Sequence, residues 1–174
     1  MLEVTIRMVR PEEAGMVADI EAICFPRAEA ASRESFEKRI AVFPDYFLVA
    51  ETGGTIIGFI NGCVTNSPVI YDEMFHDTRH HIPNGSNVSI FGLDVLPSYR
   101  KQGIATRLMQ SFIQLAKRTG RKKVILTCKE NLVHYYEAFG YISTGLSAST
   151  HGGSHWYDMT LNLPDDTSPL VQDR

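Results

Sequence analysis

What this 174-residue sequence lacks excludes several classes of protein. No apolar run approaches the roughly 20 residues that cross a bilayer, and no early segment has the charged and apolar regions of a signal peptide. The three cysteines, Cys24, Cys63 and Cys128, show no C-x-x-C spacing, which favours reduced thiols over disulfides or a zinc site. These absences predict a cytoplasmic protein with no membrane partner.

The sequence also has no basic surplus. Its 17 Lys and Arg residues are outnumbered by 20 Asp and Glu residues, giving a net charge of −3, so nucleic acid is not an expected partner. With 44% hydrophobic and 21% charged residues, the chain is long enough to bury one core. We predict one domain over residues 1–163 and a flexible tail at 164–174, where the composition is polar and acidic.

Patterns typical of metal and nucleotide sites are missing as well. Five histidines could in principle act together as metal ligands: His76, His80, His81, His151 and His155. None of them forms a His-x-x-x-His pair on a clear predicted helix. The pairs Gly53-Gly54 and Gly152-Gly153 lack the lysine of a Walker loop and the order of a dinucleotide fingerprint. Both predict hairpin turns, and no metal is expected.

Hydrophobic periodicity and turn residues predict alternating strands and helices. The expected strands lie at 5–9, 46–51, 55–64, 88–96, 124–128, 141–146 and 155–161. The expected helices begin at Pro11, after the cap Ser32, at Ile104, and at Leu132. Residues 65–87 show no sustained period and predict a long surface loop.

The turn that follows the strand at 88–96 is the most informative feature. Its sequence, Arg100-Lys101-Gln102-Gly103-Ile104-Ala105, opens an amphipathic helix. A helix start leaves N–H groups unpaired and carries about half a positive charge, so such a turn is a ready anion site. Gly103 lets the backbone approach a ligand closely. The turn therefore predicts a site for a diphosphate.

This turn and two other segments resemble the GNAT superfamily of acyl-CoA N-acyltransferases. The turn matches that superfamily's Arg/Gln-x-x-Gly-x-Gly/Ala pyrophosphate motif, Leu93-Asp94-Val95 precedes it, and an aromatic Tyr-x-x-Phe-Gly-Tyr segment follows at 136–141. Within the superfamily, residues 126–141 look most like the arylalkylamine (serotonin-type) N-acetyltransferases. The segments 8–13 and 21–25 are similar to that group too.

The resemblance implies an α/β (α+β) fold, with one domain, a mixed and mostly antiparallel sheet flanked by helices, and splayed central strands. It implies acetyl-CoA as co-substrate, a small-molecule amine as acceptor, and a homodimer, because dimers are frequent in the family. The residues implied to bind the cofactor are Leu93, Asp94, Val95, Lys101, Gln102, Gly103, Ile104, Ala105, Thr106, Asn131 and Tyr136.

The implied reaction is direct attack of a neutral amine on the thioester in a ternary complex. Tyr136 matches the family's general acid, and its reference pKa of about 10 is near enough to that of a thiol, about 8.5, for proton donation to the leaving group. A helix turns about 100° per residue, so the adjacent Tyr135 faces elsewhere and is expected to pack. A backbone N–H near Leu93 would hold the oxyanion.

The sequence departs from the animal arylalkylamine enzymes where those carry two histidines that help to take the amine's proton. Ser89 and Phe91 stand at these positions, and with Phe25 they are expected to line the acceptor site. Another base must serve, and the candidates are His134, His151, His155, Glu29 and Asp94.

The acceptor and the activity stay open at this point. An aryl- or alkylamine is the leading acceptor, ahead of a polyamine, an amino sugar and a protein N-terminus. The missing histidines also allow a protein that senses acyl-CoA without turnover. A third alternative is acetylation of a protein or peptide amine, with residues 65–87 as a docking surface.

Overall fold

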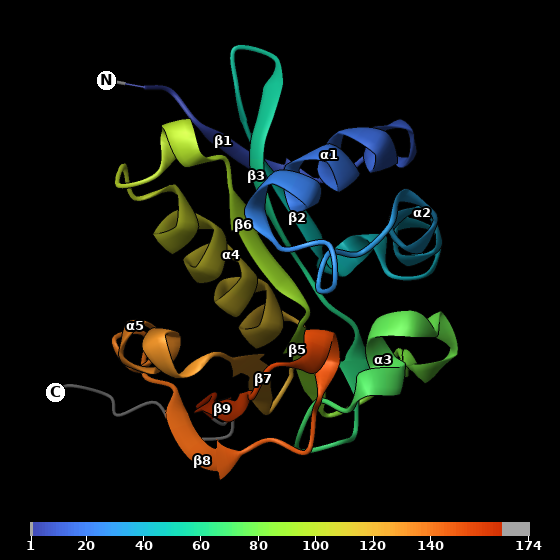
Figure 1. The fold of residues 1–174 in the computed structure, drawn as a ribbon, viewed down its shortest axis with the longest axis vertical. Coiled ribbons are helices and arrows are strands. Elements are labelled where there is room, and N and C mark those ends of the chain that lie inside the picture. Colours follow the sequence, from blue (N-terminus) through green and yellow to red (C-terminus); the bar gives the residue numbers. More distant parts are fainter. Residues whose placement is uncertain (1, 165–174) are drawn as a thin grey trace, which may run out of the picture.

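Two β-sheets and the helices around them make up residues 2–164, the part of the chain that this computed structural model describes (Figure 1). The helices are α1 (Ala14–Cys24), α2 (Arg33–Val42), α3 (Asp72–His76), α4 (Ile104–Arg118) and α5 (Val133–Glu137). The strands are β1 (Thr5–Met8), β2 (Phe47–Thr52), β3 (Thr55–Asn61), β4 (Val64–Thr65), β5 (Asn87–Ile90), β6 (Gly92–Val95), β7 (Lys123–Cys128), β8 (Ile142–Leu146) and β9 (Tyr157–Asn162). The expected α/β class is confirmed.

The first sheet has the strand order β1-β2-β3-β6, and all of its neighbours are antiparallel. Gly53 and Gly54 turn the chain between β2 and β3 with φ angles of 54° and 79°, a conformation that glycine adopts without a Cβ clash. The predicted hairpin is therefore confirmed. At the other side of β3 lies β6, which forms the edge of this sheet.

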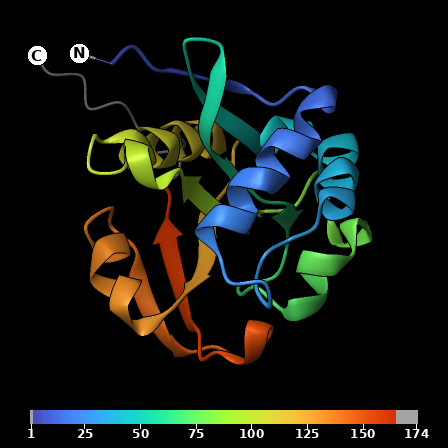
Figure 2. The same ribbon diagram turned by 45° about the horizontal axis from the view of Figure 1, so that its top comes forward.

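The two faces of the first sheet are covered by different helices (Figure 2). On one face α4 packs its apolar side, with Leu108 and Phe112 fully buried. On the other face α1 and α2 pack over the sheet, where Phe36 of α2 meets Phe59 of β3 in an edge-to-face contact at 5.5 Å. Because side chains alternate along a strand, one sheet serves both cores and holds β6 in a fixed place.

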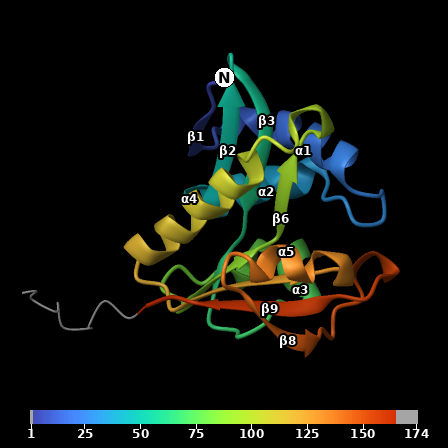
Figure 3. The ribbon, with the colours of Figure 1, turned by 90° about the vertical axis from the view of Figure 1, so that its left-hand side faces the viewer.

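The second sheet has the order β4-β5-β7-β9-β8 and lies across the end of the first (Figure 3). Its strands β5 and β7 are parallel, and in this pair Ile90 lies beside Leu126. The chain leaves this sheet at Phe91, and β6 then pairs with β3 of the first sheet. Strands β6 and β7 consequently diverge, which confirms the expected splay of the central strands.

The prediction of a long surface loop at 65–87 was wrong in part, because this mostly irregular and partly exposed segment contains helical turns. This segment contains α3 and a 3-10 turn at Thr78–His80, and it buries Ile70 and Met74 in a small core shared with Phe43, Cys63 and Ile125. α3 has five residues, too few for an apolar period to be visible in the sequence. The segment is thus a packed wall of the molecule.

Two further expectations concern the chain ends and membranes. Within residues 2–164, no helix is both long and apolar enough to cross a bilayer. The tail predicted at 164–174 lies outside the described residues from position 165 onward.

Candidate active site

The divergence of β6 from β7 leaves one edge of β6 without a strand partner. Side chains reach this edge instead: Arg100 Nε and the Cys24 thiol both donate to the carbonyl oxygen of Val95, at 3.0 Å and 3.4 Å. An open strand edge offers backbone groups to an extended ligand, as in β-augmentation. This edge of β6 is the one expected to pair with a pantetheine arm, although the Val95 carbonyl on it already accepts from Arg100 and Cys24.

The turn after β6 presents its backbone outward. Lys101 and Gly103 have φ angles of 62° and 80°, and helix α4 begins after Gly103 without a side-chain cap. A Cβ placed on Gly103 would have no atom within 4 Å, so the space before the turn is open. The first N–H groups of α4 are thus free for an anion. Ile104 points its side chain into the core, so it offers the turn only its backbone.

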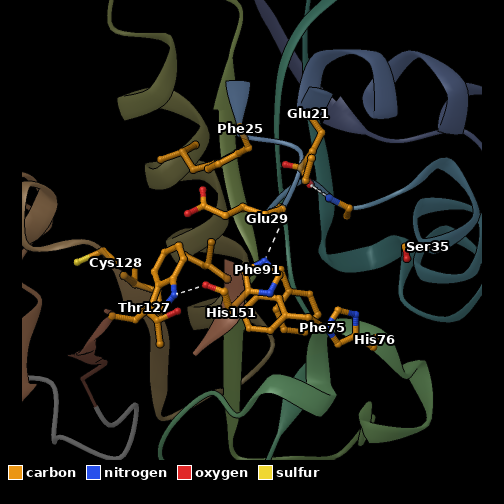
Figure 4. Close-up of a pocket in the computed structure, with 18 of the residues that line it drawn as sticks. Glu21, Phe25, Glu29, Ser35, Phe75, His76, Phe91, Thr127, Cys128 and His151 are labelled. Carbon is orange, nitrogen blue, oxygen red and sulfur yellow. Dashed lines mark hydrogen bonds between the residues drawn. The ribbon is translucent and has the colours of Figure 1, made fainter. Parts of the chain in front are cut away.

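A cavity of about 320 Å³ lies beside the open strand edge (Figure 4). Its walls come from α1 and the segment after it, α2, α3, the β5–β6 junction, β7, α5 and the turn at 151–156. Phe25 and Phe91 lie in the wall, where the sequence predicted them. Ser89 does not line the cavity, because it is fully buried. Its hydroxyl accepts from the backbone N–H of Cys63 and donates to the carbonyl oxygen of the same residue.

Tyr136 lies in the cavity wall together with Leu93 and Cys128. Its ring meets those of Tyr135 and Tyr141 edge to face at 5.1 Å and 5.9 Å. Burial raises the pKa of Tyr136 well above its usual value, so the phenol stays protonated across the neutral range. Tyr135 packs on Phe139 and is 38% exposed. Only Tyr136 of the two lines the cavity.

The segment between β8 and β9, here called the roof, lines the cavity with His151 and Trp156. His151 Nε2 lies 2.9 Å from the carbonyl oxygen of Glu29, and Ser154 donates to the Glu29 carboxylate at 3.2 Å. That carboxylate also pairs with Lys129 at 2.6 Å. The glycine pair lies in the connection between the antiparallel strands β8 and β9, so the expected hairpin is confirmed. Within this connection the pair belongs to a 3-10 turn, His151–Gly153, whose histidine contacts Glu29.

The structure separates the proposed bases. His134 has a side chain that is 96% exposed and faces Glu137, and His155 lies with Asn131 in a second, more open hollow. Neither histidine reaches the cavity, so both expectations are corrected. His151 and Glu29 do line it, but each is held in the roof contacts. Asp94 is buried behind the cavity wall.

Sequence reasoning missed Glu21, a buried acid in the cavity wall. A carboxylate on an amphipathic helix usually faces water, which is why it was not singled out. One signal was available: Glu21 stands one helical turn after Val17 and beside Ile20, on the side of α1 that packs inward. Among residues 2–164, no three His, Cys, Asp or Glu side chains are arranged to hold a metal ion.

Solved structures share the whole architecture. The GNAT-like decarboxylase GphF in complex with isobutyryl-CoA superposes with a TM-score of 0.80 at 19% identity, covering 92% of this chain and all (100%) of that one. Salmonella typhimurium yncA, solved with acetyl-CoA, gives 0.69 at 17% identity, over 97% and 98% of the two chains. Arabidopsis thaliana Naa50 with the bisubstrate analogue CoA-Ac-MVNAL gives 0.69 at 17%, over 92% and 99%. Their ligands agree with acetyl-CoA as the co-substrate expected from the sequence.

Two similar sequences carry different functional names. "Probable hydrolase YhcX" of Bacillus subtilis is 28% identical over 77% of this chain, which spans 28% of that protein's length. Serotonin N-acetyltransferase of Mesocricetus auratus is 23% identical over 90% of this chain and 76% of its own length. The model of the "Acetyltransferase (GNAT) family" matches residues 15–141, which include the open strand edge, the turn and Tyr136. The chain belongs to the GNAT acetyltransferase family.

Proposed function

We propose that this protein transfers the acetyl group of acetyl-CoA to a small primary amine, an aryl- or alkylamine, by direct attack in a ternary complex. The observation that carries the proposal is a roofed, aromatic cavity that meets the open edge of β6 at Leu93 and Tyr136. An amine held there would face a thioester laid along β6. The acyl group and its acceptor would thus meet without a covalent intermediate.

The roof favours a small acceptor over a peptide. A peptide would have to leave the cavity as an extended chain, but Glu29 of the cavity wall is tied to His151, Ser154 and Lys129. A volume of about 320 Å³ suits an amine with one ring or a short alkyl chain. Peptide acceptors would require these contacts to break.

The walls favour an apolar acceptor. Phe75 stacks on His151 at 5.0 Å, Phe91 lies 5.0 Å from Phe75, and Trp156 is held by a hydrogen bond from its indole to the carbonyl of His151. Rigid aromatic surfaces bind rings and alkyl chains by area and by edge or face contacts. The serotonin N-acetyltransferase among the relatives is in keeping with this acceptor class.

In the proposed reaction, the amine lone pair forms a C–N bond to the thioester carbon while the carbonyl π electrons move to oxygen. The amide N–H near Leu93 would stabilise that oxyanion. The nitrogen, which is positively charged after the attack, loses one proton to a base. The C–S bond breaks with its electron pair on sulfur, Tyr136 donates its proton there, and the phenolate is reprotonated from solvent. Burial raises the pKa of Tyr136, so the phenol carries its proton at neutral pH when the C–S bond breaks.

The first test is an amine panel with acetyl-CoA, in which thiol release is followed for tryptamine-like, polyamine, amino-sugar and peptide acceptors. We expect turnover on aryl- or alkylamines and little on peptides. Turnover on peptides alone would replace this proposal with protein acetylation. Tight cofactor binding with no release on any acceptor would favour a sensor of acyl-CoA.

The role of Tyr136 is tested by Tyr136→Phe, with Tyr135→Phe as the matched control on the adjacent residue. Loss of a general acid lowers kcat by about 100-fold, whereas cofactor affinity should stay near normal. Tyr135→Phe should change kcat little, since that ring is outside the cavity wall. Unchanged kcat in Tyr136→Phe across the pH range would remove Tyr136 from the mechanism.

A further inference from the structure

Three ionisable side chains are almost out of contact with solvent at one end of the cavity. Glu21 of α1 is 6% exposed, Arg39 of α2 is 4% exposed, and Asp94 of β6 is 1% exposed. Burying a charge is costly unless it is paired and hydrogen-bonded. Such a cluster in a cavity wall is a candidate for function.

Arg39 directs its hydrogen bonds at uncharged groups. Its Nη1 donates to Asn61 Oδ1 at 3.0 Å and its Nη2 to the carbonyl oxygen of Phe75 at 3.1 Å, while its guanidinium lies 4.9 Å from the ring centre of Phe91. Burial lowers the pKa of Arg39 to about 10, which still leaves it cationic at neutral pH. One fixed positive charge is therefore available to balance one negative charge nearby.

The two carboxyls converge over Gly92. A Cβ placed on Gly92 would lie 3.1 Å from Asp94 Oδ1 and 3.7 Å from Glu21 Oε1. Glu21 Oε2 is held by the backbone N–H of Ala31 at 3.1 Å, as the dashed line in Figure 4 marks. Both oxygens of Asp94 are buried without a hydrogen-bond partner among the described residues. The free oxygens of the pair thus face the same small space.

Two carboxylates this close cannot both be ionised in a buried site. Burial raises the pKa of Asp94 well above its usual value, and the neighbouring Glu21 raises it further; burial also raises the pKa of Glu21. The other groups that act on the pair are Arg39 from α2, His151 from the roof and Cys24 of α1. The pair accordingly shares one proton, and its single negative charge is balanced by Arg39.

Only one member of the pair can meet an acceptor. Glu21 lines the cavity, as does Gly92, whereas Asp94 lies behind them. Gly92 also adjoins Leu93, where the thioester is proposed to lie. An amine that attacks the thioester carbon would therefore have Glu21 within the same end of the cavity.

We propose that Glu21, with Asp94 as a positioning residue behind it, accepts the proton that the acceptor amine loses during acetyl transfer. This assignment rests on the proposed function. As the C–N bond forms, the N–H proton moves to Glu21, while the sulfur takes its proton from Tyr136. The proton on Glu21 then returns through solvent to the Tyr136 phenolate, which restores both groups. The Glu21–Asp94 pair would take the role of the two histidines of the animal arylalkylamine enzymes, at whose positions this chain has Ser89 and Phe91.

The experiment measures kcat against pH at saturating acetyl-CoA with two amines of different basicity. An acidic limb that comes from the enzyme lies at the same pH for both amines, whereas one that comes from substrate protonation moves. In Glu21→Gln we expect kcat near pH 8 to fall by about 100-fold and the acidic limb to disappear. Affinity for CoA should stay within about twofold, since Glu21 lies on the acceptor side.

Asp94→Leu distinguishes positioning from mere support of the fold. Leucine cannot donate the hydrogen bond by which a protonated Asp94 lowers the pKa of Glu21, so the acidic limb should move to higher pH. A purely structural role would lower kcat without moving the limb. This variant also decides the case if Glu21→Gln does not fold.

Glu29→Gln is the matched control, because Glu29 is a second buried carboxylate of the same cavity wall. The acidic limb of the kcat–pH profile of Glu29→Gln should stay at the wild-type pH, even if this variant has a lower kcat. A limb that persists unchanged in Glu21→Gln, or that moves only in Glu29→Gln, overturns the assignment. Failure of the proposed function is distinct from both outcomes, because the wild-type protein would then release no thiol with any amine.

Discussion

The candidate active site has two regions that differ in the groups they present to a ligand: one presents mainly backbone groups, and the other presents side chains. The open edge of β6 and the turn at 100–106, here called the cofactor half, come from one continuous stretch of chain. The cavity lined by Glu21, Phe75, Phe91 and His151, here called the acceptor half, gathers side chains from segments far apart in the sequence. The two halves meet at Leu93.

This difference decides how each half recognises its ligand. Backbone groups in a turn depend on φ and ψ angles, so the cofactor half is sensitive to a few glycines and tolerant of most side-chain changes. The acceptor half depends on packing and on a buried charge balance between elements. Its specificity can therefore change while the cofactor half stays the same.

The largest effect should follow from breaking the charge balance of the acceptor half with Arg39→Met. This change keeps much of the side-chain volume but removes the positive charge and leaves Asn61 and the Phe75 carbonyl without their donors. Loss of one partner from a buried charged group costs about 3 kcal/mol or more in the free energy of unfolding. Denaturant unfolding monitored by circular dichroism would measure it.

Arg33→Met is the control, because Arg33 lies on the same helix and its ion pair with Glu37 is exposed. Its cost should stay below about 0.5 kcal/mol. Equal losses in the two variants would contradict the view that the acceptor half holds an essential buried charge.

A smaller effect, confined to the cofactor half, is expected from Gly103→Ala. The φ of 80° is unfavourable for alanine by roughly 1–2 kcal/mol, so the turn would shift and its N–H groups would no longer converge. Affinity for CoA, measured by calorimetry, should fall about tenfold, which equals roughly 1.4 kcal/mol. Gly54→Ala is the matched control, since Gly54 has a φ of 79° and equally open space, but lies in the β2–β3 hairpin.

If both variants lose stability and only Gly103→Ala loses CoA affinity, the turn at Gly103 binds CoA, because backbone strain alone would affect both variants alike. Unchanged CoA affinity in Gly103→Ala would move the diphosphate away from this turn.

The backbone elements of the cofactor half, strand β6, the turn and helix α4, could be predicted from the sequence. Their features are local: a strand, a glycine with positive φ and an amphipathic helix follow one another, so a short motif is enough to recognise them. The hairpin at Gly53-Gly54 and the cap at Ser32, whose hydroxyl accepts from the N–H of Ser35, were predictable for the same reason. Each depends on residues within one turn of each other.

The acceptor half was predictable only in part, because its contacts join distant segments. Phe25 and Phe91 line the cavity proposed for the acceptor, whereas Ser89 does not, because its hydroxyl bonds to Cys63. Glu21 and Asp94 are 73 positions apart, and nothing local to either residue shows that they meet. Such a pair becomes visible only when α1 is packed on the first sheet.

The smallest expected effect uses Cys24 to report on the boundary of the cofactor half. Cys63 and Cys128 are each 2% exposed, whereas Cys24 is half-buried with its thiol on the Val95 carbonyl. Burial raises the pKa of Cys24, so iodoacetamide should label it slowly near pH 8, yet before the other two. Because a pantetheine arm along β6 would cover that thiol, saturating CoA should slow its labelling a few-fold, and an acceptor amine alone should not. Mass spectrometry of the peptide that contains Cys24 measures the rate, and equal labelling with and without CoA would mean that the cofactor does not follow the open edge of β6.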